Sequence, residues 1–122
     1  MPFYIHVPAV KTAALNATST MSTVSIDRNC RLTKVILTAR ETVTHHAVNY
    51  SQINVKAGSD LLASRVFNAS SLTALTPESL TVDSAKNDLE DGDVLNIQYD
   101  YAASGLAVNC DLTLVFEPSR QY

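Results

Sequence analysis

The chain has 122 residues, of which 46% are hydrophobic and 17% are charged, and its formal net charge is −3. This length suits one domain, and so many apolar residues with so little charge exclude a disordered tail. A domain that follows a nucleic-acid backbone is normally basic, so nucleic acid is not an expected partner. A membrane is not expected either, because no apolar run approaches the roughly 20 residues of a membrane-spanning helix.

The composition predicts β-structure rather than a helical bundle. The chain contains 12 Ser, 12 Thr and 12 Val residues but only 4 Glu and 4 Lys residues, and the last two types usually cover exposed helix faces. Valine and threonine favour strands, and the 8 Asn residues favour turns. We therefore expect residues 1–122 to form one all-β domain.

The first half of the chain contains several predicted strands. Three short candidates occupy its start: residues 3–9, 11–17 and 21–26. Residues 31–43 alternate between apolar and polar positions over a length that indicates a bulge or a bend. Residues 50–56 alternate again, with Ile53 and Val55 predicted to face inward and Asn54 outward.

In the second half the clearest feature is a predicted antiparallel hairpin. Residues 94–101 and 106–116 each alternate with a period of two, and a short loop over residues 102–105 joins them. Tyr99 and Tyr101 fall on the apolar face of the first of these strands. Both tyrosines are therefore expected in the core.

Between these regions the pattern is less regular. Residues 61–67 fit either one or two helical turns or a strand, residues 80–82 fit a short strand, and residues 83–93 form a polar connection. The total is about eight short strands separated by turn signals. That number is typical of an antiparallel β-sandwich or a jelly-roll-like barrel.

Two groups of side chains could bind a metal. His45 and His46 are adjacent, so on a strand they would point to opposite faces, and no cysteine or carboxylate pair lies nearby at a usual ligand spacing. The acidic residues of the polar connection could hold calcium, but they lack the order of a calcium-binding loop: Asp83, Asp88, Glu90, Asp91 and Asp93. A polar loop and a solvated acidic loop are the alternative interpretations, and no metal or other cofactor is expected.

No catalytic motif is present, so the chain is not expected to be an enzyme. The three glycines, Gly58, Gly92 and Gly105, belong to neither a nucleophile elbow nor a phosphate-binding loop. A jelly-roll metalloenzyme would need clustered histidines, and the chain has only three. Tyr50 and Tyr122 are the aromatic residues that could stack on a sugar ring.

The two cysteines, Cys30 and Cys110, lie 80 positions apart and form no metal-binding motif. Cys110 lies on the apolar face of its strand, whereas Cys30 follows a turn. A disulfide would require their strands to be neighbours, which the sequence does not establish, and we expect free thiols. Residues 1–8 contain two prolines and no cationic region, so they are not a signal peptide and synthesis in a cytosol is expected.

Charge is unevenly distributed along the chain. Residues 1–61 carry a net charge of +3 and residues 62–122 a net charge of −6, which together give the −3 of the whole chain. If the fold separates these halves, the domain has a charge dipole suited to head-to-tail docking. If the sheets mix the two halves, the asymmetry disappears.

The second half of the chain resembles a known group of virion proteins. Residues 89–97 have the pattern L-x-x-G-D-x-L at the start of a strand, and a closing strand follows that ends in residues 113–118. Residues 57–61 repeat the same turn earlier in the chain. Over residues 50–118 the chain is similar to the jelly-roll domains of tailed-phage capsid cement (decoration) proteins and of related phage head and tail appendages.

The resemblance implies a structural function without catalysis. It implies a homotrimer on the exterior of a capsid, made in the host cytoplasm, that binds and stabilises the lattice of the major capsid protein through many copies. Residues 1–20 would form an arm that adds a strand to a neighbouring subunit, so removing residues 1–9 would weaken assembly more than folding. A phage tail or head appendage with a carbohydrate- or receptor-binding module is the alternative.

Overall fold

The computed structural model describes residues 2–12 and 17–118, and these residues form nine strands and no helix. The strands are, in chain order, β1 (Phe3–Thr12), β2 (Ser19–Ser25), β3 (Cys30–Ala39), β4 (Tyr50–Ala57), β5 (Asp60–Val66), β6 (Pro77–Leu80), β7 (Asp88–Leu89), β8 (Val94–Ala102) and β9 (Val108–Pro118). The all-β prediction is therefore confirmed.

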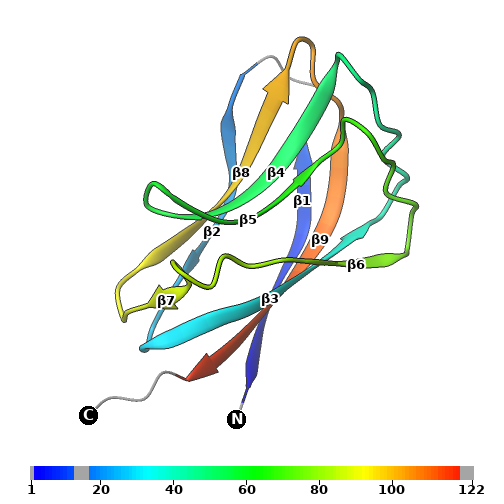
Figure 1. Ribbon diagram of the computed structural model, residues 1–122. Coiled ribbons are helices and arrows are strands. Elements are labelled where there is room, and N and C mark those ends of the chain that lie inside the picture. The colour runs from blue at the N-terminus through cyan, green and yellow to red at the C-terminus, as the bar shows by residue number, and fades with distance from the viewer. Residues whose placement is uncertain (1, 13–16, 119–122) are drawn as a thin grey trace.

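The strands form two antiparallel sheets that pack face to face (Figure 1). The first sheet has the order β1-β9-β3-β6, with β7 also paired to β3, and the second has the order β2-β8-β4-β5. Four antiparallel pairs nest inside one another along the chain, as if one long hairpin had been folded over into a sandwich: β1–β9, β2–β8, β3–β6 and β4–β5. This winding is that of a jelly roll, so the predicted architecture is confirmed.

The predicted hairpin of residues 94–101 and 106–116 is wrong, because β8 and β9 belong to different sheets. β8 pairs with β2 and β4, whereas β9 pairs with β1 and β3. The connection between them crosses from one sheet to the other, and Tyr99 Oη donates a hydrogen bond across it to the carbonyl of Leu106 at 3.1 Å. Alternation identifies the buried face of each strand, but it does not identify the neighbouring strand.

At the N-terminus, one strand replaces two of the predicted ones. β1 continues past Pro8 because the register shifts by one residue between Val7 and Val10, and this bulge accommodates a residue without a backbone N–H. Residues 13–16 of the predicted strand 11–17 lie outside the described residues. Residues 3–12, expected to belong to an arm, pair with β9 of their own sandwich, and a contact with a neighbouring subunit stays a prediction.

Several other boundaries differ from the sequence pattern. β3 ends at Ala39, and the rest of the predicted strand 31–43 is loop, with one isolated bridge from Val43 to Leu72. Residues 61–67 form a strand, β5, and not a helical turn. The predicted strand 80–82 lies earlier, as β6, and the polar connection 83–93 contains the two-residue strand β7.

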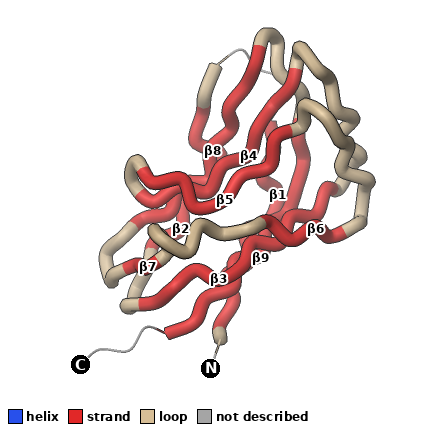
Figure 2. The backbone as a smooth tube through the Cα atoms, in the orientation of Figure 1, coloured by secondary structure: helices blue, strands red, loops and turns tan. Residues whose placement is uncertain are grey.

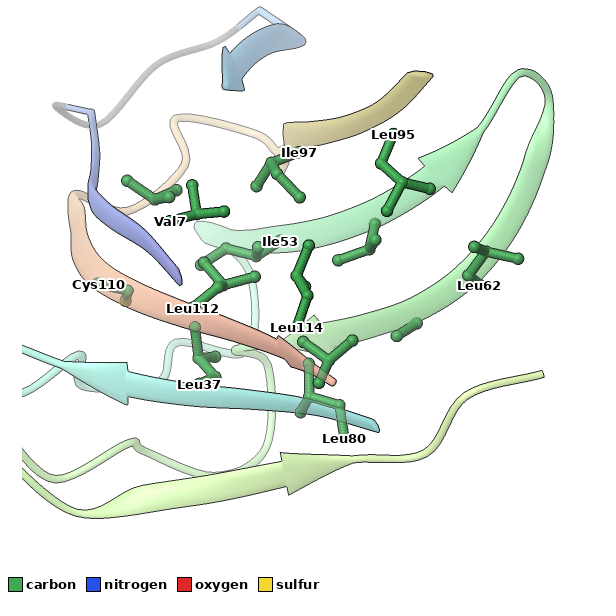
Figure 3. Packing of buried hydrophobic residues seen from close by; sticks show 14 of the residues in the cluster. Val7, Leu37, Ile53, Leu62, Leu80, Leu95, Ile97, Cys110, Leu112 and Leu114 are labelled. Carbon is green, nitrogen blue, oxygen red and sulfur yellow. The ribbon is translucent and has the colours of Figure 1, made fainter. Parts of the chain in front are cut away.

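The core consists of aliphatic and aromatic side chains from both sheets. Figure 3 shows Leu37, Leu112 and Leu114 of the first sheet facing Ile53 and Ile97 of the second. Each of these five side chains is fully buried. The two sheets therefore enclose a packed interior.

The two tyrosines of β8 have different environments. Tyr99 is fully buried, as predicted, but Tyr101 is 39% exposed. Tyr101 pairs with Ser51 at the very start of β4, where the second sheet ends, so little of the other sheet covers it. Asn54, which the alternation places outward, is only 5% exposed, because the outer face of this sheet is itself crowded with side chains.

The fold mixes the two halves of the chain. Each sheet combines strands from residues 1–61 with strands from residues 62–122. Three ion pairs join the halves: Arg31–Asp88 at 3.1 Å, Arg40–Asp111 at 3.1 Å and Asp60–Lys86 at 3.9 Å. The charge asymmetry of the sequence therefore does not become a dipole between two separate halves of the domain.

Candidate functional site

Three loops meet at one end of the sandwich, and we call this region the loop end. They are residues 40–49 between β3 and β4, residues 67–76 between β5 and β6, and residues 103–107 between β8 and β9. Figure 2 shows the first two of these loops side by side. Val43 and Leu72 exchange two backbone hydrogen bonds, of 2.9 and 3.0 Å, so the two long loops are joined almost as strands are.

A buried cation anchors the second of these loops. Arg65 is 8% exposed, and its guanidinium lies over the ring of Phe67, 4.7 Å from the centroid. It donates hydrogen bonds to the carbonyls of Val66 at 2.7 Å and Ser70 at 3.2 Å. Arg65 Nε also forms an ion pair with Glu78, so each guanidinium nitrogen has an acceptor and the group lies over one aromatic ring.

The adjacent histidines lie in the first loop and bind different groups. His45 Nδ1 lies 2.8 Å from Ser71 Oγ. His46 Nδ1 accepts backbone N–H bonds from Val48 at 3.1 Å and Asn49 at 2.7 Å. The two rings therefore do not converge on one point, and sequence spacing alone could not distinguish their roles.

No metal centre forms at the loop end. Within residues 2–12 and 17–118, no group of three or more His, Cys, Asp or Glu side chains could hold a metal ion. The third histidine, His6, lies on β1, where its Nδ1 is 3.3 Å from Thr113 Oγ1. The chemistry of the loop end is thus hydrogen bonding between loops.

A pocket of about 380 Å³ opens beside the loop end. Val43 and Val108, both buried, contribute its apolar lining, and Thr12, Glu41 and Asn109 contribute polar groups. A hydroxyl, a carboxylate and an amide are groups that can hydrogen-bond to a ligand.

The predicted acidic cluster lies at the opposite end of the sandwich, and three of its five carboxylates, those of Asp83, Asp88 and Asp93, are used within the fold. Asp83 Oδ1 accepts the N–H of Ala85 at 3.0 Å, and Asp93 Oδ2 accepts the N–H of Glu90 at 2.9 Å. Asp88 pairs with an arginine of β3, and a lysine lies in the same pocket of about 280 Å³. These carboxylates stabilise turns instead of converging on a cation site.

Both cysteines are buried free thiols, which answers the question left open by the sequence. They lie on the neighbouring strands β3 and β9, but Cys30 is opposite Pro118 whereas Cys110 is opposite Ala39. Nine residues of β3 separate these positions, about 30 Å along a strand, and a disulfide needs Cα atoms within about 7 Å. Burial raises the pKa of the Cys110 thiol to about 11 and also raises the pKa of Cys30.

The outer face of the second sheet carries a row of amides that the sequence alternation did not single out. Gln52 Nε2 donates to Asn54 Oδ1 at 2.7 Å, and Asn54 Nδ2 donates to Gln98 Oε1 at 3.5 Å. Tyr50, a predicted sugar-stacking residue, lies half-buried at one end of this row, opposite Ala102 of β8. The other predicted residue, Tyr122, lies outside the described residues.

No protein-family model matches the chain, and no curated protein matches it. Among solved structures, the chain is similar to a chain in the structure of infectious bursal disease virus, Gx strain, with a TM-score of 0.41 and 12% identity. The similarity covers all of this chain but 33% of that chain, so this chain spans about a third of the other's length. In the described residues, no helix is long and apolar enough to cross a membrane.

Proposed function

We propose that this chain is a structural protein of a virion: a capsid cement or decoration protein that binds the lattice of the major capsid protein from outside. It acts without catalysis or a cofactor, as a homotrimer. The observation that carries the proposal is the jelly-roll sandwich with a packed apolar interior. Viral capsid domains, lectins and cupins share this fold. The function of a jelly roll is therefore inferred from what its interior holds and what its surfaces can bind.

The interior supports a structural role over an enzymatic one. A jelly-roll enzyme of the cupin type holds its metal and substrate between the sheets. Here buried side chains such as Leu37, Ile53 and Leu112 fill that space (Figure 3). Ligands or partners of this chain therefore bind to its outer faces and loops.

The outer face of the first sheet is the surface that we assign to the capsid. Tyr4, which is 65% exposed, lies opposite Val115, and Val115 lies opposite Lys34. The next row contains Thr113 and Ile36, both half-exposed. An exposed tyrosine beside the apolar side chains of Val115 and Ile36 and the hydroxyl of Thr113 can form the centre of a protein–protein interface, with Lys34 at its rim.

Sedimentation with capsids assembled from the major capsid protein tests this assignment. We expect saturable binding, and we expect Tyr4→Glu to abolish it while leaving the fold intact, because Tyr4 points into solvent. Tyr101→Glu, near the end of the central strand β8 of the other sheet, is the matched control and should bind normally. Failure of the unmodified chain to sediment with capsids would contradict the proposal.

The second candidate function is an appendage that binds a receptor glycan. The amide row and Tyr50 at its end favour it, because amides, hydroxyls and aromatic faces are the groups that recognise sugars. Binding to host cells that is lost in Tyr50→Ala but kept in Tyr4→Glu would favour this function over the first.

A further inference from the structure

We propose that His46, and not its neighbour His45, makes the loop end of the sandwich sensitive to acid. The imidazole Nδ1 of His46 accepts two main-chain N–H groups, from Val48 at 3.1 Å and from Asn49 at 2.7 Å. A nitrogen that accepts hydrogen bonds carries no proton, so His46 is neutral here with its proton on Nε2. The ring acts as the cap of a tight turn, a role that asparagine or aspartate usually fills.

Protonation of this ring removes both hydrogen bonds. The new proton would sit on Nδ1 and face two backbone N–H groups, which can only donate. Neither partner can reverse its role, so the imidazolium form of His46 does not fit the observed turn.

His45 differs because its partner, the hydroxyl of Ser71, can either donate or accept a hydrogen bond. Ser71 Oγ accepts the backbone N–H of His45 at 3.1 Å, and its own hydroxyl hydrogen can point to His45 Nδ1, 2.8 Å away. When the ring is protonated, Nδ1–H can donate to the same oxygen instead. This contact therefore survives protonation, and the two adjacent histidines have opposite consequences for the loop.

The turn at His46 connects all three loops of the loop end. The backbone N–H of His46 donates to the carbonyl of Phe67 at 3.2 Å, in the second loop. Asn49, whose N–H is held by the ring, accepts the N–H of Ser104 through its Oδ1 at 3.1 Å, in the third loop. Release of Asn49 thus loosens the third loop as well as the first.

Few other ionisable groups surround this turn. The second loop (residues 67–76) and the third loop (residues 103–107) contain none. The remaining groups on the first loop and the adjoining strand ends are Arg40, Glu41, His45, Tyr50, Arg65, Glu78, Asp100, Tyr101, Cys110 and Asp111. Arg40 pairs with Asp111, and Arg65 pairs with Glu78. Both arginines keep their positive charge at pH 8 and at pH 5, so a difference between these pH values does not come from them.

Hydrogen exchange followed by NMR tests the proposal on the full chain. We expect the amides of Val48, Asn49 and Ser104 to be protected at pH 8, after correction for the intrinsic exchange rate. At pH 5 their protection should fall by at least about fivefold, the ratio that the loss of one hydrogen bond implies. His46→Asn keeps an acceptor that does not titrate, so its protection should be the same at both pH values.

Three controls make the result decisive. His46→Ala should resemble the acid form at both pH values, and His45→Asn and His6→Asn should keep the pH response of the unmodified chain. The imidazole ¹⁵N shifts of His46 at pH 8 should show the proton on Nε2. The proposal is overturned if that proton is on Nδ1, if protection does not change with pH, or if His46→Asn retains the response. None of these outcomes depends on the chain being a capsid protein.

Discussion

Arg65 Nε lies 2.6 Å from Glu78 Oε2, and this ion pair joins β5 of the second sheet to β6 of the first. The arginine side chain is 10% exposed and the glutamate 38% exposed. Together with the backbone bond from Asp83 N–H to the carbonyl of Leu62 at 2.8 Å, the pair closes the open edge between the sheets. It also sets the position of the loop that follows β5.

Replacement of Glu78 by Gln should therefore destabilise the sandwich. The change keeps the shape of the side chain but leaves a largely buried guanidinium without its counter-charge. We expect the free energy of unfolding to fall by about 1–2 kcal/mol, less than for a fully buried pair because Glu78 is partly solvated. Urea unfolding measures this change. Asp27→Asn, which breaks an exposed pair with Arg28, is the control and should destabilise the chain much less than Glu78→Gln does, because water screens that pair. Equal effects of the two changes would contradict the role given to Glu78.

β1 should be needed for folding and not only for assembly. Phe3 stacks on Phe116, with ring centroids 5.1 Å apart, and Val7 is buried. We predict that Phe3→Ala lowers the free energy of unfolding by about 2 kcal/mol, whereas Tyr4→Ala changes it by less than about 0.5 kcal/mol. Removal of residues 1–9 should leave the chain unfolded or aggregated, because β9 would lose most of its pairing with β1 and become an exposed edge strand. A cooperative unfolding transition in the shortened chain, with near-normal stability, would restore the idea of a dispensable arm.

The buried thiols should make the protein less stable in alkali. Burial raises the pKa of Cys110 to about 11 in the folded chain, whereas an unfolded cysteine has a pKa of about 9. Below pH 9 the thiol is neutral in both states and stability is unaffected. As the pH rises from 9 to 11, the Cys110 thiol ionises only in the unfolded chain, so the free energy of unfolding falls. Cys110→Ala should flatten this part of the stability curve. A thiol reagent that modifies the folded chain at pH 8 as fast as the denatured chain would contradict the burial.

The oligomeric state is a prediction of the resemblance to cement proteins. Light scattering coupled to size exclusion should give a mass of three times 13.2 kDa. A chelator should not change that mass, because Asp83 and Asp93 already accept turn N–H groups and Asp88 already pairs with an arginine. A monomer would contradict the trimer, and dissociation by chelator would contradict the account of the acidic end.

The sequence predicts the faces of the strands better than their neighbours. Alternation correctly placed Ile53, Tyr99 and Cys110 in the core, because a period of two is a local property. Pairing is not local: β8 and β9 follow one another along the chain and still join different sheets. The exposure of Tyr101 is not predictable from alternation either, because it depends on where the opposing sheet ends.

The candidate sites were less predictable than the fold. The pair His45–His46 is visible in the sequence, but its interpretation depends on whether each ring faces a hydroxyl or a backbone N–H. The burial of Asn54 depends on contact with Gln98, 44 positions away. Such contacts follow from the winding of the jelly roll, which no local motif encodes.

By the proposed function, this chain is an abundant structural component of a virion. The most direct test is to quantify it in purified virions of the virus proposed to encode it, by mass spectrometry with isotope-labelled peptides of this chain and of the major capsid protein. A capsid cement protein is expected at an abundance of the same order as that of the major capsid protein. Absence from virions, or a few copies in each, would contradict a capsid cement protein.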